Sequence, residues 1–225
     1  MESVKFHFDP RCPWCYQTSR WAKRLESLGE IELEWGVFSL EVVNLEDSRD
    51  PRELESTGSP ALRTAVMIER EHGSKAMGPF YTALGRRHFE QAPPPSDPVG
   101  AVKESLEEAG LESALCDKAL GDASTWQVVI DETLRLVEKV GKLGVPTIVL
   151  DGGEGPAIFG PVIARLPSDE DAVELWRHTL WLVRYGNFAE LKRKRDGLDE
   201  LPAMVWWAEQ RAKRDAEKAG EQRSG

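Results

Sequence analysis

Cysteine, net positive charge and long apolar runs are all scarce in this chain. Three cysteines among 225 residues are too few for a framework of structural disulfides. The formal net charge of −10 disfavours nucleic acid as a partner, because phosphate backbones are bound by clustered Lys and Arg. The one basic run, LKRKR at 191–195, is short. No segment approaches the ~20 apolar residues of a membrane span.

The amino-terminal stretch MESVKFHFDP has no basic region followed by an apolar one, so it does not resemble a secretory signal. We therefore expect a cytoplasmic protein that binds neither membranes nor nucleic acids. In a reducing compartment, a cysteine pair is expected to be catalytic or metal-binding rather than a structural disulfide.

The first forty residues show the periodicity of a strand, a helix and a second strand. Residues 3–9 alternate apolar and polar side chains, as a strand does. Apolar residues recur at helical spacing from Trp14 to Leu25, and Gly29 can end that helix. Residues 31–40 alternate again. This order predicts a βαβ unit with two parallel strands.

From about residue 46 to residue 141 the pattern is helical, and no strand is predicted there. Helices are predicted at 59–73 and 78–91, and the proline-rich stretch 92–98 is expected to form a turn between helices. Three further helices, each ended by glycine, are predicted between residues 97 and 141.

Strand patterns return at residue 144. Residues 144–153 and 156–163 are predicted to form a hairpin, and a helix capped by Ser168 is predicted over 167–186. The tail beyond residue 198 is polar and is predicted to be frayed or disordered, although its two adjacent tryptophans would be unusual in a solvated tail.

The sequence thus predicts an α/β protein in which an all-helical segment is inserted into a sheet domain. The predicted sheet domain comprises residues 1–45 and 142–198. The inserted helical lid domain comprises residues 46–141, and a partly disordered C-terminal extension comprises residues 199–225.

Two of the cysteines, Cys12 and Cys15, form a Cys-x-x-Cys pair between the first strand and the first helix. A zinc site needs four ligands, whereas Cys116 stands alone and the four histidines are not spaced as a ligand pair. The pattern disfavours zinc, and no metal is expected. A purely structural pair is disfavoured as well, because the two cysteines fall where the strand gives way to the helix.

That position favours redox chemistry. A helix N-terminus offers unpaired N–H groups and the positive end of the helix dipole, and both stabilise a thiolate. Cys12 is predicted to be the more exposed nucleophile with a lowered pKa, and Cys15, one turn further along, the resolving thiol. Pro13 suits the first helical turn, where no N–H is needed.

Two other residues have simpler interpretations. His7 on the first strand could tune Cys15, but its alternation places it opposite Phe6 and Phe8, and a hydrogen-bonded structural histidine is favoured. Cys116, in a short helix far from any partner, is predicted to be a buried small side chain.

The order of these elements resembles the thioredoxin fold. The pattern is a strand, Cys-Pro-x-Cys on a helix, a second strand, and later Gly144-Val145-Pro146-Thr147 before another strand. In that fold the residue matching Pro146 is a cis proline beside the cysteine pair, and the backbone of its neighbour, here Val145, pairs with bound substrate. The helical insertion is similar to that of the DsbA family. The fold class implied is α/β, thioredoxin-like, with an inserted all-helical domain.

Several stretches resemble one branch of that family, the mycothiol-dependent reductases (nitroreductases) of actinobacteria. The likeness covers about residues 4–195 and rests on FDPRCPWC, SLEVVNLE, EHGSKAMGPFYTALG, GVPTIVL, FGPVI and YGNFAELKRKR. It implies a cytosolic thiol-disulfide oxidoreductase that works as a reductase, with no bound cofactor and with a low-molecular-weight thiol such as mycothiol as electron donor. The implied partners are that thiol and a disulfide or electrophilic substrate, with the helical domain closing over the site.

The same resemblance implies which residues contact substrate. Asn44, Tyr81 and His88 lie in matching stretches that would line the cleft between the domains, with packing or capping as the alternative for each. Trp14 lies between the cysteines, where it could tune the reduction potential or contact substrate, and simple packing against the lid is an equal alternative. The predicted catalytic residues are Cys12, Cys15 and Pro146, and the predicted substrate-binding residues are Pro13, Trp14, Asn44, Tyr81, His88 and Val145.

Two other functions stay open. The pair could serve a DsbA-type oxidase or isomerase acting on proteins or biosynthetic intermediates, or a non-catalytic redox sensor whose oxidation moves the lid. The missing secretory signal favours the reductase, because a dithiol in a reducing compartment is mostly reduced. Neither the physiological substrate nor the oligomeric state is predicted.

Overall fold

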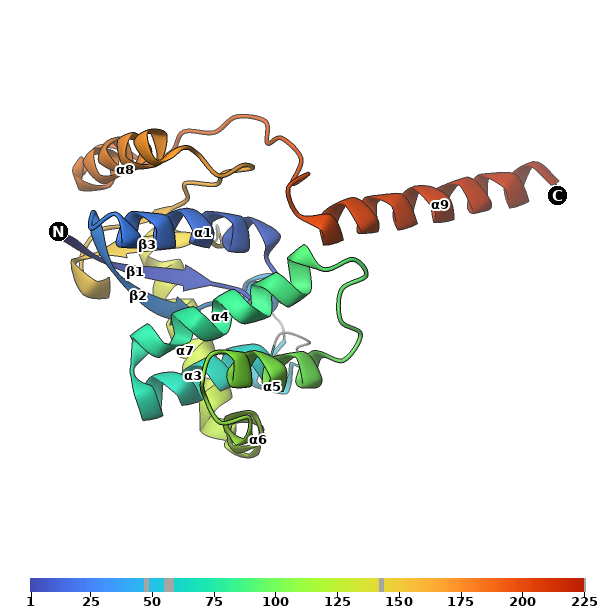
Figure 1. Cartoon of the computed structure of the whole chain (residues 1–225), viewed down its shortest axis with the longest axis horizontal. Helices are drawn as coiled ribbons and strands as arrows, with labels where there is room; N and C mark the ends of the chain where they lie inside the picture. The colour runs from blue at the N-terminus through green and yellow to red at the C-terminus, as the bar shows by residue number, and fades with distance from the viewer. Residues whose placement is uncertain (47–48, 55–58, 142–143, 225) are drawn as a thin grey trace.

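Figure 1 shows the computed structural model of the chain, which describes residues 1–46, 49–54, 59–141 and 144–224. Its four strands form one sheet in the order β2-β1-β3-β4. β1 and β2 are parallel, and β3 is antiparallel to both β1 and β4. The parallel first pair and the later hairpin are thereby confirmed. The strands are β1 (Glu2–Phe8), β2 (Ile31–Val37), β3 (Thr147–Leu150) and β4 (Ala157–Phe159), with the 3-10 turn η4 (Asp151–Gly153) between the last two.

Helices make up most of the remaining described chain. α1 (Pro13–Ser27) connects β1 to β2, and α8 (Asp169–Arg184) follows β4. Ser168 caps α8 by accepting a hydrogen bond from the Asp171 N–H, as predicted. Between β2 and β3, the described residues form helices and no strand. These are α2 (Leu40–Val43), η1 (Pro51–Glu53), α3 (Ser59–His72), η2 (Ser74–Ala76), α4 (Met77–Gly85), the π-helical turn η3 (Arg86–Glu90), α5 (Pro98–Glu108), α6 (Ala114–Gly121) and α7 (Ala123–Val140).

The second strand is shorter than the predicted range 31–40. It ends at Val37, and Ser39 then caps the single turn of α2 by accepting a hydrogen bond from the Val42 N–H. The Ser39 N–H itself donates to Thr133 Oγ1 of α7 at 3.0 Å. The chain leaves the sheet here because its backbone groups find partners on α2 and α7 instead of on a neighbouring strand.

The two faces of β1 meet different helices. The Phe8 ring stacks on Tyr81 of α4, with 3.9 Å between the ring centroids. Lys5 points to the opposite face, where its Nζ lies 3.2 Å from a carboxylate oxygen of Glu132 in α7. The alternating side chains of β1 therefore face α4 on one side of the sheet and α7 on the other. The cysteine pair follows shortly after the end of this strand.

The helical segment and the sheet share one core. A single cluster of buried apolar side chains includes residues of β1 and β2 together with residues of α3, α4, α6 and α7. Glu132 of α7 also accepts a hydrogen bond from the Val37 N–H of β2 at 3.2 Å. The domain boundaries after residues 45 and 141 stay predictions, and residue 142 lies outside the described residues.

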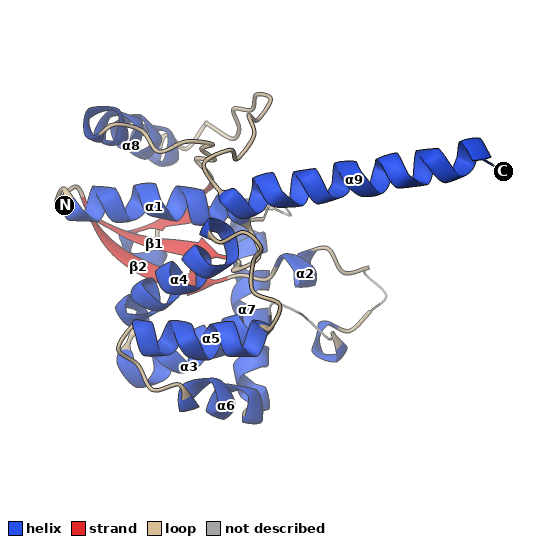
Figure 2. Ribbon diagram, turned by 45° about the vertical axis from the view of Figure 1, so that its right-hand side comes forward, coloured by secondary structure: helices blue, strands red, loops and turns tan. Residues whose placement is uncertain are grey.

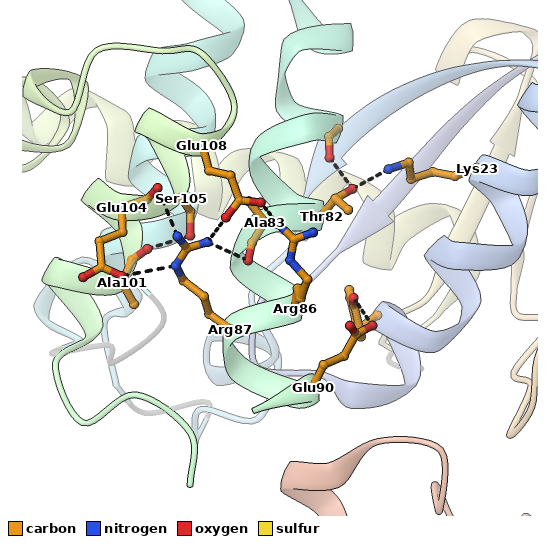
Figure 3. Close-up of polar contacts among 12 residues, drawn as sticks. Lys23, Thr82, Ala83, Arg86, Arg87, Glu90, Ala101, Glu104, Ser105 and Glu108 are labelled. Atoms are coloured by element: carbon orange, nitrogen blue, oxygen red, sulfur yellow. Dashed lines mark hydrogen bonds and ion pairs between the residues drawn. The ribbon is translucent and has the colours of Figure 1, made fainter. Parts of the chain in front are cut away.

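Polar contacts fasten α4 and η3 to the helices on both sides (Figure 3). Lys23 of α1 donates a hydrogen bond to Thr82 Oγ1 at 2.8 Å. On the other side, Arg86 and Arg87 both pair with Glu108 of α5. α4 and η3 are thus held between α1 on one side and α5 on the other.

The C-terminal extension forms a helix, in contrast to the frayed or disordered tail expected from its polar composition. α9 (Pro202–Ser224) projects away from the rest of the protein in Figures 1 and 2. The start of α9 is anchored because Leu198 and Leu201 are buried in a cluster with Tyr16 and Phe89. The polar composition of the tail does not show that these two leucines have buried partners elsewhere in the chain. None of the described helices, α9 included, is long and apolar enough to cross a membrane.

Gly85→Ala is expected to destabilise this fold. A Cβ at buried Gly85 would lie 2.2 Å from Cδ2 of Tyr16, and that ring cannot swing away easily because it stacks on Phe89. We expect the free energy of unfolding, measured by urea denaturation, to fall by ~1–3 kcal/mol. Gly121→Ala is the control, because nothing lies within 4 Å of its added Cβ. Equal stability of the two variants would contradict the tight packing described here.

Candidate active site

Cys12 is the N-cap residue of α1. Its backbone is extended, with φ −90° and ψ 107°, and its Sγ accepts a hydrogen bond from the Cys15 N–H at 3.4 Å. Pro13 follows in the first helical turn, where its missing N–H leaves nothing unsatisfied. The Cys12 N–H donates to the Asp9 carbonyl at 3.0 Å, which fixes the entry to the helix. The cysteine pair therefore lies at a helix N-terminus, where a thiolate is stabilised.

The two sulfurs differ in exposure and in pKa. Cys12 is 7% exposed, whereas Cys15 is completely buried. The Cys15 thiol donates a hydrogen bond to the Cys12 sulfur, and this bond, helped by the N–H groups of Cys15 and Trp14, lowers the pKa of Cys12. Burial raises the pKa of Cys15 well above its ordinary value. Neither cysteine is in a disulfide, so the structure is the dithiol form, with Cys12 the more readily ionised thiol.

A buried carboxyl group lies beside the pair. Asp9 Oδ1 accepts a hydrogen bond from the Arg11 N–H and Oδ2 accepts one from the Leu40 N–H, both at 2.7 Å. Asp9 thus ties the cysteine loop to the start of α2. Burial raises the pKa of Asp9 to about 6, and its charge in turn opposes ionisation of Cys12. No motif singles out Asp9, although a carboxylate directly after a buried strand is a signal that could have drawn attention to it.

Asp9→Asn is expected to lower the pKa of Cys12. The substitution removes a negative charge that disfavours the thiolate while keeping the size of the side chain. Because the pKa of Asp9 is about 6, the difference from the wild type should be present above that pH and should vanish below it. The measurement is a pH titration of the ultraviolet absorbance of the thiolate. Asp169→Asn, at an exposed carboxylate that pairs with Arg24, is the control and should leave the titration unchanged.

A cis peptide bond lies next to Cys12. The bond between Val145 and Pro146 is cis, and the Val145 carbonyl oxygen is 3.7 Å from Cys12 Sγ although the two residues are 133 positions apart. The Pro146 carbonyl accepts a hydrogen bond from the Gly160 N–H at 2.8 Å. This hydrogen bond ties the Val145–Pro146 loop to the start of the segment after β4. The fold therefore places Val145 and Pro146, the two residues predicted to belong to the site, beside the cysteine pair.

Three of the predicted substrate-binding residues lie around the cysteine loop and α2. Trp14 is half-buried, and the guanidinium carbon of Arg195 lies 5.3 Å from the centroid of its ring. His88 of η3 is half-buried; burial lowers its pKa and the Pro10 carbonyl opposes that shift, so His88 lies near the cysteine loop. Asn44 is exposed at the C-terminal end of α2. Arg195 is a neighbour of Trp14 that was not predicted, because in the sequence it is only the last residue of the basic run 191–195.

Tyr81 is packed in the core, which was the alternative to the predicted substrate contact, and it does not line a cleft. Its side chain is completely buried against Phe8, and its hydroxyl has no hydrogen-bond partner in the described part of the chain. Burial raises the pKa of Tyr81, and the charges of Cys15 and Cys12 raise it further. Tyr81 therefore lies behind the cysteine pair, because the face of α4 that carries it packs onto the sheet.

His7 was predicted to be a hydrogen-bonded structural histidine, and Cys116 a buried small side chain. The buried Nδ1 of His7 lacks a hydrogen-bond partner among the described residues, so the expected hydrogen-bonded histidine is not found. Burial lowers the pKa of His7 to about 3, which keeps the ring neutral, and the ring packs closely on Gly36. Cys116 is buried in α6, as predicted.

A cleft of about 360 Å³ runs along α1 without including Cys12. Its lining includes Tyr16, Lys23, Thr82 and Leu166. Over the described ranges, no group of three or more His, Cys, Asp and Glu side chains is arranged to hold a metal ion. The reactive sulfur therefore lies outside this cleft, at the end of the helix that forms one of its walls.

Comparison with known proteins places this site in a family. The family model described as Rv2466c-like, mycothiol-dependent nitroreductase Rv2466c, matches residues 11–193, which contain both the cysteine pair and Pro146. The chain belongs to the Rv2466c-like family. Rv2286c, an uncharacterized protein of Mycobacterium tuberculosis, is 33% identical over 201 residues, which are 88% of this chain and 85% of that protein. The resemblance found in the sequence is confirmed, and the family to which this chain belongs is one of oxidoreductases.

Solved structures of low sequence identity share the fold of this Rv2466c-like chain. The cytosolic disulfide reductase DsbM from Pseudomonas aeruginosa is 16% identical with a TM-score of 0.56, and the match covers 80% of this chain and 99% of that chain. The probable DsbA oxidoreductase SCO1869 from Streptomyces coelicolor is 19% identical with a TM-score of 0.53, covering 86% and 94%. These likenesses confirm the DsbA-like thioredoxin fold.

Proposed function

We propose that this member of the Rv2466c-like family is a cytoplasmic dithiol reductase that works through Cys12 and Cys15 and is recharged by a low-molecular-weight thiol such as mycothiol. The observation that carries the proposal is the position of Cys12, which caps α1, has a lowered pKa and lies beside the cis Pro146 loop. A thiolate in that position is the nucleophile that thiol–disulfide exchange requires. The description of the family supports mycothiol as the donor.

In the first step, the Cys12 thiolate attacks one sulfur of a disulfide substrate. A bond forms between Cys12 and that sulfur, the S–S bond of the substrate breaks, and the other half leaves as a thiolate that takes up a proton. Val145 and Pro146 flank the attacking sulfur, so the substrate would lie against this loop.

In the second step, Cys15 attacks the sulfur of Cys12. Cys15 is one turn along α1 and already hydrogen-bonds the Cys12 sulfur. The Cys12–Cys15 disulfide forms, and the second half of the substrate leaves as a thiol. Two mycothiol molecules then restore the dithiol and leave as mycothiol disulfide, so two electrons pass from the thiol to the substrate. An electrophilic substrate would accept the same two electrons.

The surroundings of Cys12 suggest which residues contact the substrate. Pro13 and Trp14 form the turn between the two sulfurs, and His88 lies near the Pro10 carbonyl at the start of the same loop. We assign substrate contact to these three residues, to Val145 beside Cys12 and to the exposed Asn44 on α2.

The test of the proposed function compares electron donors and measures the reduction potential of the pair. With mycothiol, glutathione or thioredoxin as the electron source, turnover of a disulfide substrate is expected to be fastest with mycothiol. A potential near the ~−270 mV of thioredoxin supports the reductase, whereas one near the ~−120 mV of DsbA would favour a disulfide oxidase instead. Oxidation of the dithiol without turnover under any donor would identify a redox sensor.

A further inference from the structure

Residues 194–204, here called the strap, run from the segment after α8 into the first turn of α9. The match to the family model ends at residue 193, so the strap lies beyond the matched region. Figure 1 shows the chain crossing from α8 to the N-terminal end of α1, where α9 begins, and Figure 2 shows the same arrangement. The strap is therefore a segment outside the matched region that lies near the end of α1 carrying the cysteine pair.

Apolar contacts anchor the strap to the helix that carries the cysteines. Leu198 and Leu201 are buried with Tyr16, the residue directly after Cys15, and with Phe89 of η3. Trp14 packs against the same cluster. The burial of two leucines fixes the strap beside the first turn of α1.

Polar contacts hold the strap as well. Glu200 Oε2 accepts a hydrogen bond from Nε2 of Gln17, a buried side chain of α1, at 2.7 Å. Asp199 pairs with Arg165 at 2.7 Å. These contacts attach the strap both to α1 and to the loop before α8, so residue 195 has a defined place relative to the cysteines.

Arg195 lies over the ring of Trp14, the side chain between the two cysteines. It is exposed, and neither Arg195 nor residues 192–194 form an ion pair with a carboxylate in the described part of the chain. A guanidinium stacked on an aromatic face keeps the N–H groups at its edge available for an anion. In a chain with a net charge of −10, this is a local positive charge over the residue that lies between the two cysteines.

We propose that Arg195 is a specificity-determining residue that binds a carboxylate group of the small disulfide reduced by Cys12. The inference rests on the proposed function, because it concerns the substrate of the same site. The strap holds the guanidinium beside Trp14, where an approaching disulfide with a carboxylate is attracted and one with an ammonium group is repelled. The fork of N–H groups of Arg matches the two oxygens of a carboxylate.

The reaction itself is unchanged by this contact. The protein dithiol and one disulfide R–S–S–R give the protein disulfide and two thiols R–SH, with two electrons and two protons passing to the substrate. Arg195 exchanges neither protons nor electrons. Its effect is on the encounter and binding of the substrate.

The test is a single-turnover oxidation of the pre-reduced protein, with no thiol donor present. Three small disulfides are compared: dithiodipropionate, which carries carboxylates, neutral bis(hydroxyethyl) disulfide, and cystamine, which carries ammonium groups. Formation of the Cys12–Cys15 disulfide is followed by acid quench and mass spectrometry. The wild type should prefer dithiodipropionate to cystamine, and Arg195→Gln should lower the ratio of these two rate constants about fivefold.

Two further variants sharpen the result. Arg195→Lys keeps the positive charge and should retain most of the preference. Lys192→Gln removes the same charge from the same basic run outside the strap, and should leave the ratio unchanged. Raising the ionic strength should lower the ratio in the wild type, because an exposed charge is screened by salt.

Several outcomes would overturn the role of Arg195. These are an unchanged ratio in Arg195→Gln, an equal fall in Lys192→Gln, or a wild-type ratio that does not depend on salt. The salt series uses the wild type alone, so a ratio that does not change with salt overturns the role of Arg195 even if a variant fails to fold. Failure of the proposed function looks different, because then none of the three disulfides oxidises the dithiol of the wild type.

Discussion

Cys12→Ser is expected to abolish thiol-dependent turnover, with a fall in rate of about a thousandfold or more. A serine hydroxyl does not ionise near neutral pH and cannot form a disulfide, so neither step of the exchange can take place. The fold should survive, because serine is a preferred N-cap residue and its oxygen can accept the Cys15 N–H that Cys12 Sγ accepts now. The measurements are the rate of disulfide reduction with mycothiol and the thermal midpoint of unfolding.

Cys116→Ser is the matched control for this result. Cys116 undergoes the same chemical change but is buried in α6, apart from the reacting pair. Its turnover should equal that of the wild type, although a buried hydroxyl is expected to cost ~1–3 kcal/mol of stability. Undiminished turnover in Cys12→Ser would show that the reaction does not pass through this pair. A loss in Cys116→Ser as well would indicate a general effect on the fold.

The placement of Cys12 could be predicted because it depends on local sequence. The strand period ends at Phe8, the helical period begins near Trp14, and the residues between them can only be the entry to the helix. The capping of α8 by Ser168 was predicted on the same kind of local evidence. In both cases the residue that matters and the backbone groups it binds lie within a few positions of one another.

The surroundings of Cys12 could not be predicted in this way. Asp9 is buried together with the Leu40 N–H of α2, which donates a hydrogen bond to its carboxylate. Tyr81 faces the core because of the way in which α4 packs onto the sheet. Arg195 reaches Trp14 only because Leu198 and Leu201 find a place on α1. These are tertiary contacts between distant segments, and a hydrophobic pattern records that a residue is apolar without recording its partner.

Cys15→Ser is expected to stop the reaction at the mixed disulfide. Without a resolving thiol, the bond between Cys12 and one half of the substrate has no intramolecular partner that can displace it. Intact-protein mass spectrometry of the variant after reaction with a disulfide should show the added mass of one substrate half. Cys12→Ser treated in the same way should stay unmodified. Turnover of Cys15→Ser at the wild-type rate would mean that the donor thiol resolves the intermediate by itself.

Cys15→Ala separates the resolving role of Cys15 from its role as a hydrogen-bond donor. The bond from the Cys15 thiol is the largest cause of the lowered pKa of Cys12. A serine hydroxyl can still donate to the Cys12 sulfur, whereas alanine cannot, so the pKa of Cys12 should be higher in Cys15→Ala than in Cys15→Ser. Both variants should trap the mixed disulfide, but Cys15→Ala should react more slowly with the disulfide at low pH, and the gap should shrink as the pH rises. Equal titration curves would instead assign the activation of Cys12 to the N–H groups at the start of α1.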